Sequence, residues 1–94
     1  METIQLSDFD IVETKTFVKS RQKIDPKVYK KIQNIVYPQL RKNPYFGTNI
    51  KRLKDDLSLY YRYRIGSYRL FYLIDNSKLV VAVVDLKHKQ SAYS

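Results

Sequence analysis

The hydrophobic pattern of the chain changes from helical to strand-like near its middle. Between Tyr29 and Leu40 the apolar residues recur every three to four positions, which is typical of a helix with one buried face. After residue 56, aromatic and β-branched residues dominate and short breaks separate them, as in strands joined by tight turns. The three predicted strands are Leu57–Ile65, Tyr68–Asp75 and Lys78–Leu86.

Local start signals place two helices and one more strand in the first half of the chain. Asp25-Pro26 combines a capping residue with a proline at the first helical position, so the second helix is predicted to begin there. Pro38 lies within its apolar stripe and is predicted to kink or end it early. Upstream, residues 4–6 are predicted to form a short strand, and Ser7 to cap a first helix that runs to about Lys19.

The resulting element order is β-α-α-β-β-β, with a predicted loop at residues 45–56. This order indicates an α+β, two-layer fold, in which two N-terminal helices pack on one face of an antiparallel β-sheet. Ninety-four residues with 44% hydrophobic content suffice for one such domain, which is expected to span residues 1–94.

The charge distribution narrows the class of partner. The net charge is +9, of which residues 1–40 contribute +2 and residues 41–94 contribute +7. A basic half on a small domain favours a polyanion, with nucleic acid ahead of an acidic protein or an anionic membrane; charge that serves solubility alone is the alternative. The sequence has no cysteine, no membrane-spanning apolar stretch and no recognisable signal peptide, so a cytoplasmic protein is expected.

Three arginines share one face of the first predicted hairpin. If Gly66-Ser67 is a two-residue loop, Arg64 lies directly opposite Arg69, and Arg62 lies on the same face, together with Tyr60 and Phe71. Like charges in opposite positions cost roughly 0.2–1 kcal/mol, so the pair is best explained if a phosphate fills the gap; a solvated sheet face is the alternative. The residues predicted to face the helices are Tyr61, Tyr63, Ile65, Tyr68, Leu70 and Tyr72.

The second hairpin extends this arginine face toward the C-terminal tail. A two-residue loop at Asn76-Ser77 would place Asp75 opposite Lys78. The same alternation predicts three residues of the last strand on the arginine face: Val84, Leu86 and His88. The tail KHKQSAY, residues 87–93, is predicted to continue beside the arginines.

The residue types present in the chain limit which reactions it could catalyse. One histidine, no cysteine and no glycine-rich loop provide no metal or nucleotide motif, so neither a metal nor a cofactor is expected. RNA carries its own nucleophile, the ribose 2′-OH, and its cleavage needs alignment, charge stabilisation and proton transfer. Arginines can stabilise charge but remain protonated. Proton transfer is therefore expected from His88, Tyr93 or a lysine.

Two segments resemble a known family of bacterial toxins. They are KRLKDDLSLYYRYRIGSYRLFYLID, which begins at Lys51, and VVAVVDLKHKQSAY, which ends at Tyr93. Their pattern is a basic-Leu-basic step, a Tyr-basic-x-basic strand, a short turn, a Tyr-Arg strand start, an apolar strand, and a His/basic tail that ends in tyrosine. This pattern resembles the RelE/ParE superfamily of type II toxin–antitoxin systems, in particular its RelE-like branch.

The resemblance implies a RelE-like microbial RNase fold and a metal-independent endoribonuclease, an mRNA interferase, that cuts mRNA in the 30S A site of the ribosome. It also implies a cognate antitoxin as partner. The acidic general base of YoeB-like members would fall near Lys51, so that variant of the mechanism is not expected. The implied catalytic residues are Arg62, Arg64, Arg69, His88, Lys89 and Tyr93. The implied RNA-binding residues are Lys51, Arg52, Lys54 and Lys87.

Two other functions remain open from the sequence. A ParE-like toxin would inhibit DNA gyrase and cleave nothing, although the retained arginines and Tyr93 argue against it. A non-catalytic RNA-binding module would use exposed aromatic rings for base stacking and would need no proton carrier.

Overall fold

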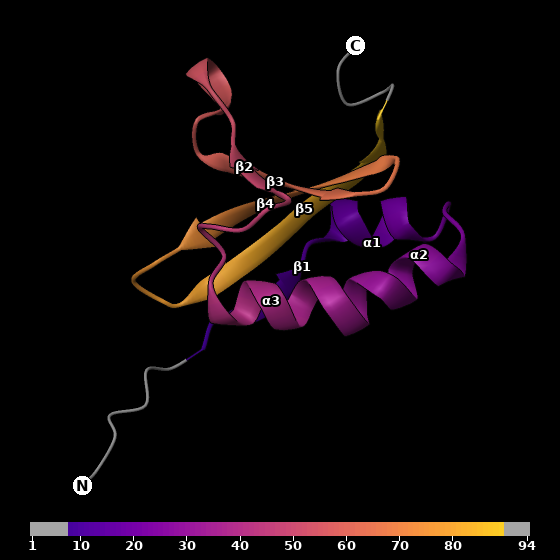
Figure 1. Ribbon diagram of the computed structural model, residues 1–94, viewed down its shortest axis with the longest axis horizontal. Helices are drawn as coiled ribbons and strands as arrows, with labels where there is room; N and C mark the ends of the chain where they lie inside the picture. The colour runs from indigo at the N-terminus through magenta and orange to yellow at the C-terminus, as the bar shows by residue number, and fades with distance from the viewer. Residues whose placement is uncertain (1–7, 90–94) are drawn as a thin grey trace, which may run out of the picture.

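The computed structural model describes residues 8–89, in which a five-stranded sheet is covered on one side by helices (Figure 1). The strand order is β1-β5-β4-β3-β2. The strands are β1 Asp10–Glu13, β2 Ile50–Arg52, β3 Tyr60–Ile65, β4 Tyr68–Asp75 and β5 Val80–His88. The helices are α1 Lys15–Arg21, α2 Pro26–Lys31, the π-helix η1 Ile32–Val36, α3 Tyr37–Lys42 and the 3₁₀-helix η2 Asp55–Leu57. None of the helices in this part of the chain is long and apolar enough to cross a membrane.

The α+β two-layer class and the β3–β4 hairpin are confirmed. All five predicted pairs of this hairpin are present, including Arg64 opposite Arg69, and Tyr60 opposite Leu73 adds a sixth. Gly66 opens the turn with φ +54, in the left-handed region that glycine enters at no steric cost. The turn therefore fixes the register, and the register fixes which side chains face the helices.

The N-terminal strand differs from the prediction. Residues Asp10–Glu13, predicted as helix, form β1 and pair in parallel with β5, so the sheet is mixed and not purely antiparallel. The short DIVE segment alternates in exposure as a strand does. Helix α1 begins only after Thr14, whose hydroxyl oxygen accepts a hydrogen bond from the Phe17 N–H at 3.3 Å. The predicted strand at residues 4–6 and the Ser7 cap lie outside the described residues.

The second predicted helix begins at the predicted place but extends further. Asp25 caps it by accepting a hydrogen bond from Lys27 N–H at 2.9 Å, and Pro26 is its first residue. Pro38 was predicted to kink or end the helix early, but α2, η1 and α3 follow one another without a break to Lys42. Pro38 stands in the first turn of α3, where its missing N–H is tolerated, and the preceding turn is widened into a π-helix.

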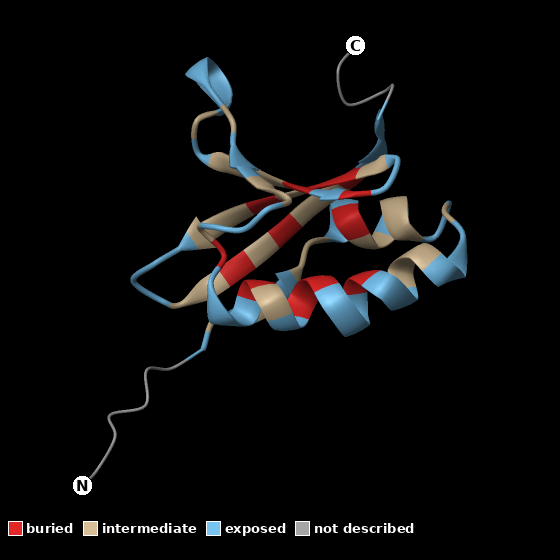
Figure 2. Ribbon diagram, in the orientation of Figure 1, coloured by how far each residue is buried: buried red, intermediate tan, exposed pale blue. Residues whose placement is uncertain are grey.

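The core lies between this long helical segment, α1 and the sheet. Figure 2 shows the buried residues along the sheet and on the helix side that faces it, while the outer side of the helices is exposed. The fully buried side chains from opposite layers include Phe17, Ile32 and Leu40 from the helices and Leu70 and Tyr72 from β4. The alternate residues of β3 and β4 predicted to face the helices do so.

A polar cluster centred on Glu13 joins the helices to β1. Glu13 Oε2 accepts hydrogen bonds from the hydroxyls of Tyr29 at 2.8 Å and Tyr37 at 2.7 Å. Its Oε1 lies 3.5 Å from Nε of Arg21, whose guanidinium lies over the Tyr29 ring at 4.4 Å from the centroid. Burial and the hydrogen bond to Glu13 raise the pKa of Tyr29 and, much further, that of Tyr37.

The connection from β4 to β5 also differs from the prediction. Asp75 pairs with Val80 and not with Lys78, so the loop has four residues, Asn76–Leu79. Asp75 Oδ1 accepts hydrogen bonds from the Ser77 hydroxyl at 2.7 Å and from Lys78 N–H at 3.1 Å. These bonds lower the pKa of Asp75 and stabilise the wider turn, which closes with Leu79 at φ +55.

Candidate nucleic-acid interface

A β-bulge in β5 decides which residues lie on the side of the sheet away from the helices, hereafter the open face. The pairing of β4 with β5 shifts by one residue next to Phe71, so Val84 is an extra residue and Phe71 pairs with Asp85. If the pairing at Val83 continued without the bulge, Asp85 would face the helices. With the bulge, Leu86 remains in the core at 5% exposure and Asp85 reaches the open face.

Cationic residues line up across the strands on the open face. Because paired residues on neighbouring strands point to the same side of a sheet, the register assigns two rows to this face. The first row is Lys51, Arg62, Phe71 and Asp85; the second is Arg64, Arg69 and Lys87. Five cations and one carboxylate therefore belong to these two rows.

A cavity of about 460 Å³ lies on the open face. Three cations reach it from three segments: Lys54 from the stretch after β2, Arg62 from β3 and Lys87 from β5. In Figure 1 the segment around β2 and η2 rises from one end of the sheet, and the end of β5 rises from the other. The complete lining is Leu53, Lys54, Leu57, Tyr60, Arg62, Phe71, Val84, Asp85 and Lys87.

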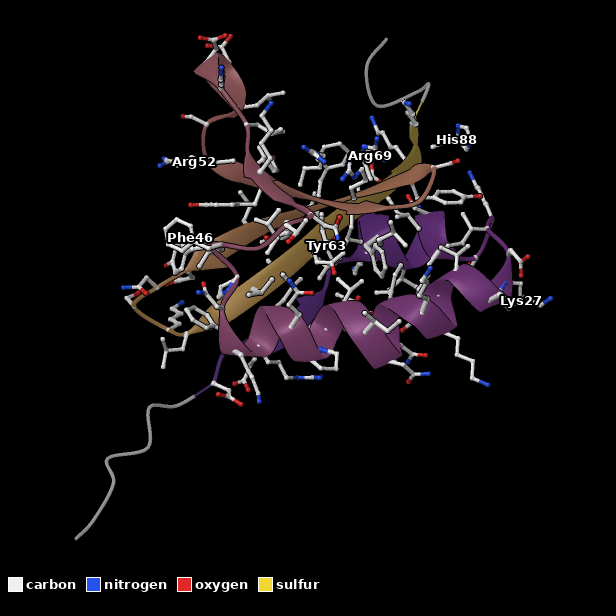
Figure 3. All side chains as sticks on the ribbon, viewed as in Figure 1. Lys27, Phe46, Arg52, Tyr63, Arg69 and His88 are labelled. Carbon is white, nitrogen blue, oxygen red and sulfur yellow. The ribbon has the colours of Figure 1, made fainter. Side chains whose placement is uncertain are left out.

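Arg64 and Arg69 differ sharply in exposure. Arg64 is exposed, whereas Arg69 is only 5% exposed, and its Nη1 donates to the carbonyl oxygens of Gly66 and Tyr68, both at 3.0 Å. Figure 3 shows Arg69 on the side of the sheet opposite Tyr63, which points toward the long helix. Neither Arg64 nor Arg69 lines the 460 Å³ cavity, so only Arg62 of the three predicted arginines does.

His88 lies on the other face from the one predicted. It pairs with Tyr68, and the two rings meet edge-on with their centroids 5.5 Å apart. The prediction that Leu86 and His88 share the arginine face is wrong, because the bulge reverses the alternation after Val84. The same prediction is correct for Val84, which lines the cavity.

Three further predicted positions lie away from the cavity or outside the described residues. Arg52 pairs with Tyr61, and its Nε donates to the Ser58 carbonyl at 2.7 Å. In Figure 3 it points outward, away from Arg69. Lys89 is exposed, and its backbone N–H donates to the Ser67 carbonyl at 2.6 Å, which ties the end of β5 to the β3–β4 turn. Tyr93 lies outside the described residues.

Reasoning from the sequence missed part of the cavity. Tyr60 and Phe71 were placed on the correct face but were not assigned to the site, although exposed rings beside arginines are a signal for base stacking. Asp85 was missed because alternation alone does not reveal a bulge. Leu53 lines the cavity from a segment that was predicted as an irregular loop, and Leu57 lines it from η2, where the start of a strand was predicted.

Comparisons with known proteins agree with this architecture. The family model described as "ParE toxin of type II toxin-antitoxin system, parDE" matches residues 11–93. A search of curated proteins gave no match. Among solved structures, the toxin–antitoxin complex RelBE2 from Mycobacterium tuberculosis has a TM-score of 0.77 and 23% identity, covering 86% of this chain and 98% of that chain.

Two more solved structures have the same fold. The RelE–RelB complex from Pyrococcus horikoshii OT3 gives a TM-score of 0.74 and 22% identity, over 87% of this chain and 96% of that chain. The YoeB/ParE toxin from Agrobacterium tumefaciens gives 0.69 and 21%, over 85% and 98%. The family match covers most of the chain, and the fold agrees with it. The chain therefore belongs to the ParE toxin family of type II toxin–antitoxin systems, within the RelE/ParE superfamily.

Proposed function

We propose that this toxin is a metal-independent endoribonuclease that cleaves mRNA in the ribosomal A site. One observation carries the proposal: the 460 Å³ cavity combines Lys54, Arg62 and Lys87 with the rings of Tyr60 and Phe71. Cations that converge on aromatic rings are the arrangement with which proteins hold single-stranded nucleic acid.

The cations would supply the electrostatic part of the reaction. When the 2′-OH attacks the adjacent phosphorus, an additional negative charge develops on the phosphate oxygens. Arg62 presents a planar fork that matches two of these oxygens, and Lys51 stands directly opposite Arg62 on β2. Fixed donors at this point stabilise the transition state more than the bound substrate, which is how they accelerate the reaction.

The aromatic rings would orient the nucleotide. Tyr60 and Phe71 lie on the same face of neighbouring strands. Phe71 pairs with Arg62, which is two residues along β3 from Tyr60, so the two rings are diagonal neighbours on this face. A base stacked on such a ring is held without a requirement for one sequence, and each stack contributes roughly 1–3 kcal/mol. Stacking would place the ribose beside Arg62 and so align the 2′-OH with the phosphate.

In this proposal the protein acts in the cytoplasm on ribosome-bound mRNA and is restrained by a cognate antitoxin. The similar structures from M. tuberculosis and P. horikoshii are complexes of a toxin with an antitoxin. An antitoxin segment that carries acidic side chains would complement the excess of +7 in residues 41–94.

Inhibition of DNA gyrase without RNA cleavage is the second candidate, favoured by the match to the ParE family model. The two functions separate in one set of assays. Purified toxin is incubated with programmed ribosomes, with and without EDTA, and the mRNA ends are mapped; a parallel reaction measures gyrase supercoiling.

The proposal expects EDTA-resistant cleavage in the A-site codon, with a 2′,3′-cyclic phosphate on one fragment and a 5′-OH on the other. Loss of supercoiling with intact mRNA would establish the gyrase function in its place. Binding of RNA without either effect would leave an RNA-binding module.

A further inference from the structure

We infer that Asp85 accepts the proton of the attacking 2′-OH and that Ser20 positions its carboxylate for this task. This inference rests on the proposed ribonuclease function. It assigns the proton acceptor to a residue of β5 that the sequence pattern would place in the core.

The β-bulge in β5 is the feature that brings Asp85 to the cavity. The bulge at Val84 turns Asp85 to the open face, where it pairs with Phe71 in the same cross-strand row as Arg62. Asp85 lines the cavity together with the cations that would hold the phosphate. Bulges are frequent next to active sites, where they change the direction in which a side chain points.

Thr14 and helix α1 hold the bulge along the edge of β5, where the pairing of β1 with β5 ends. The Thr14 hydroxyl lies 2.9 Å from the carbonyl oxygen of Val83 and 3.2 Å from that of Val84, and Thr14 N–H donates to the Val83 carbonyl at 3.0 Å. Six residues later, the Ser20 hydroxyl donates to Asp85 Oδ1 at 2.5 Å. The helix therefore fixes both the irregular backbone and the carboxylate that follows it.

The hydrogen bonds leave one carboxylate oxygen for chemistry. Oδ1 accepts from Ser20 and also from the N–H of Leu86 at 2.8 Å. Within residues 8–89, the structure gives Oδ2 of Asp85 no hydrogen-bond partner. A carboxylate held by one oxygen and available at the other is suited to accept a proton from a bound hydroxyl.

No other residue of the described cavity lining is as suitable. Lysine, arginine and tyrosine side chains carry their protons at neutral pH, so Lys54, Tyr60, Arg62 and Lys87 are donors there. His88, which the sequence suggested as proton carrier, is on the opposite face beside Tyr68. Asp85 is the carboxylate among the residues that line this cavity.

The proposed step is a transesterification within the RNA strand. The 2′-oxygen forms a bond to phosphorus while its proton passes to Asp85 Oδ2, and the bond from phosphorus to the 5′-oxygen breaks. The leaving 5′-oxygen takes a proton from the ammonium group of Lys87 or Lys54, which line the same cavity. The products are a 2′,3′-cyclic phosphate and a 5′-OH, and exchange with water restores the protonation of the carboxylate and the lysine.

The surroundings of Asp85 are strongly cationic. The cavity that Asp85 lines is also lined by Lys54, Arg62, Lys87 and Tyr60. Arg69 stands opposite Lys87 on the neighbouring strand β4. On the packed side, Lys19 and Arg21 flank Ser20 on α1, and Arg21 is paired with Glu13. The cations of the cavity would hold the phosphate on the same surface as the Asp85 carboxylate.

The test is single-turnover cleavage of ribosome-bound mRNA by wild-type protein, Asp85→Asn, Asp85→Glu and Ser20→Ala. Asp56→Asn is the matched control, because Asp56 is exposed in the segment that rises beside the cavity and its loss changes the net charge equally. Binding is measured in parallel with mRNA that carries a 2′-O-methyl group at the cleavage site, which has no nucleophile. Thermal unfolding verifies that each variant is folded.

We expect the wild-type rate to fall at acidic pH, and Asp85→Asn to cleave about 10²–10⁴-fold more slowly, with binding equal or tighter and without this fall. Asp85→Glu should recover part of the rate. Ser20→Ala should slow cleavage about tenfold with binding unchanged, since a misplaced group loses rate and not affinity. Asp56→Asn should cleave like the wild type.

The possible failures are distinguishable. If the wild type does not cleave mRNA, the proposed function is overturned and the inference with it. If the wild type cleaves and Asp85→Asn cleaves as fast as Asp56→Asn, the function stands and the role of Asp85 is overturned. If Asp85→Asn does not fold, Ser20→Ala decides: a wild-type rate and pH profile in that folded variant would overturn the inference.

Discussion

The two faces of the sheet differ in how far their charged side chains are offset by opposite charges. On the helix side, Glu13 accepts hydrogen bonds from two tyrosine hydroxyls and forms an ion pair with Arg21, so the two charges of this cluster offset each other. On the open face, the two cross-strand rows carry five cations and one carboxylate, and Arg64 stands directly opposite Arg69. The charges of the Glu13 cluster are therefore balanced, whereas the open face carries an excess of positive charge and is unbalanced.

The difference separates stability from function. A buried charge costs free energy unless it is paired, so a balanced cluster is what folding requires. An excess of like charge on a folded surface lowers stability and is retained for a partner of opposite charge. We therefore expect changes at Glu13 to affect unfolding and changes on the open face to affect the handling of RNA.

The largest effect on the open face is expected from Arg62→Ala. Removing the guanidinium from the cavity is expected to lower the rate of mRNA cleavage about 10²–10³-fold, the usual effect of losing one donor to a developing oxyanion. The free energy of unfolding should change by less than about 0.5 kcal/mol, because Arg62 is part of the unbalanced face. Arg52→Ala is the matched control, since Arg52 is the next residue along the β2–β3 ladder but lies on the other face. Equal rates for the two variants would contradict the assignment of the cavity.

The corresponding change in the balanced cluster is Glu13→Ala. It leaves the hydroxyls of Tyr29 and Tyr37 without their acceptor and Arg21 without its partner. Because Glu13 is about one-fifth exposed, water replaces part of the loss, and we expect destabilisation of about 2–3 kcal/mol in urea unfolding. Asp10→Ala, an exposed acid on the same strand, should change stability by less than about 0.5 kcal/mol. A loss below about 1 kcal/mol for Glu13→Ala would mean that the cluster is not needed for stability.

The fold was predictable where local chemistry determines it. The Gly66-Ser67 turn fixed the β3–β4 register, and Asp25-Pro26 fixed the start of the long helix, because each acts over a few residues. Strand β1 was not predictable from its four residues, since its conformation depends on pairing with β5, which is about 70 residues later. Pro38 does not end the long helix early, because it stands in the first turn of α3, directly after the π-helix η1.

The candidate site was predictable only as far as strand alternation holds. Alternation assigned Arg62 correctly to the open face, whereas Lys54 and Lys87 were assigned to RNA binding only through the family resemblance and the position of the tail. Lys87 reaches the open face because of the bulge, since unbroken alternation would turn it toward the helices. The single extra residue at Val84 then moved His88 away from this surface and Asp85 onto it. The bulge is stabilised by α1 through Thr14, a contact between residues about 70 positions apart, and no local pattern indicates it.

The balanced cluster can be examined separately through its behaviour at alkaline pH. Burial raises the pKa of Tyr37 above its ordinary value of about 10, as does its bond to Glu13, so the unfolded state ionises first. Stability from this group is complete below pH 10 and is lost as pH rises above 10, by up to about 1.4 kcal/mol per pH unit. Tyr37→Phe should be less stable than the wild type by about 1 kcal/mol at pH 7, and the difference should shrink above pH 10. Urea unfolding of both proteins at pH 7, 9 and 10.5 measures this; parallel curves would show that Tyr37 ionises equally in both states.

The smallest effect is also the most direct test of the unbalanced face. Arg64→Ala removes the exposed member of the opposed pair, and relief of repulsion with Arg69 should stabilise the fold by about 0.2–1 kcal/mol. The gain should decrease in high salt, which screens exposed charges. Arg41→Ala, which removes an exposed arginine from α3, is the control and should leave stability within about 0.5 kcal/mol.

Cleavage by Arg64→Ala, measured in the same preparations, completes the comparison. A variant that is more stable and yet slower would show that the chain retains two opposed arginines for the anion they bind together. A variant that is less stable than the wild type in low salt would mean that Arg64 contributes more through packing against its neighbours than it costs through repulsion. In that case the open face, like the cluster at Glu13, would also serve the stability of the fold.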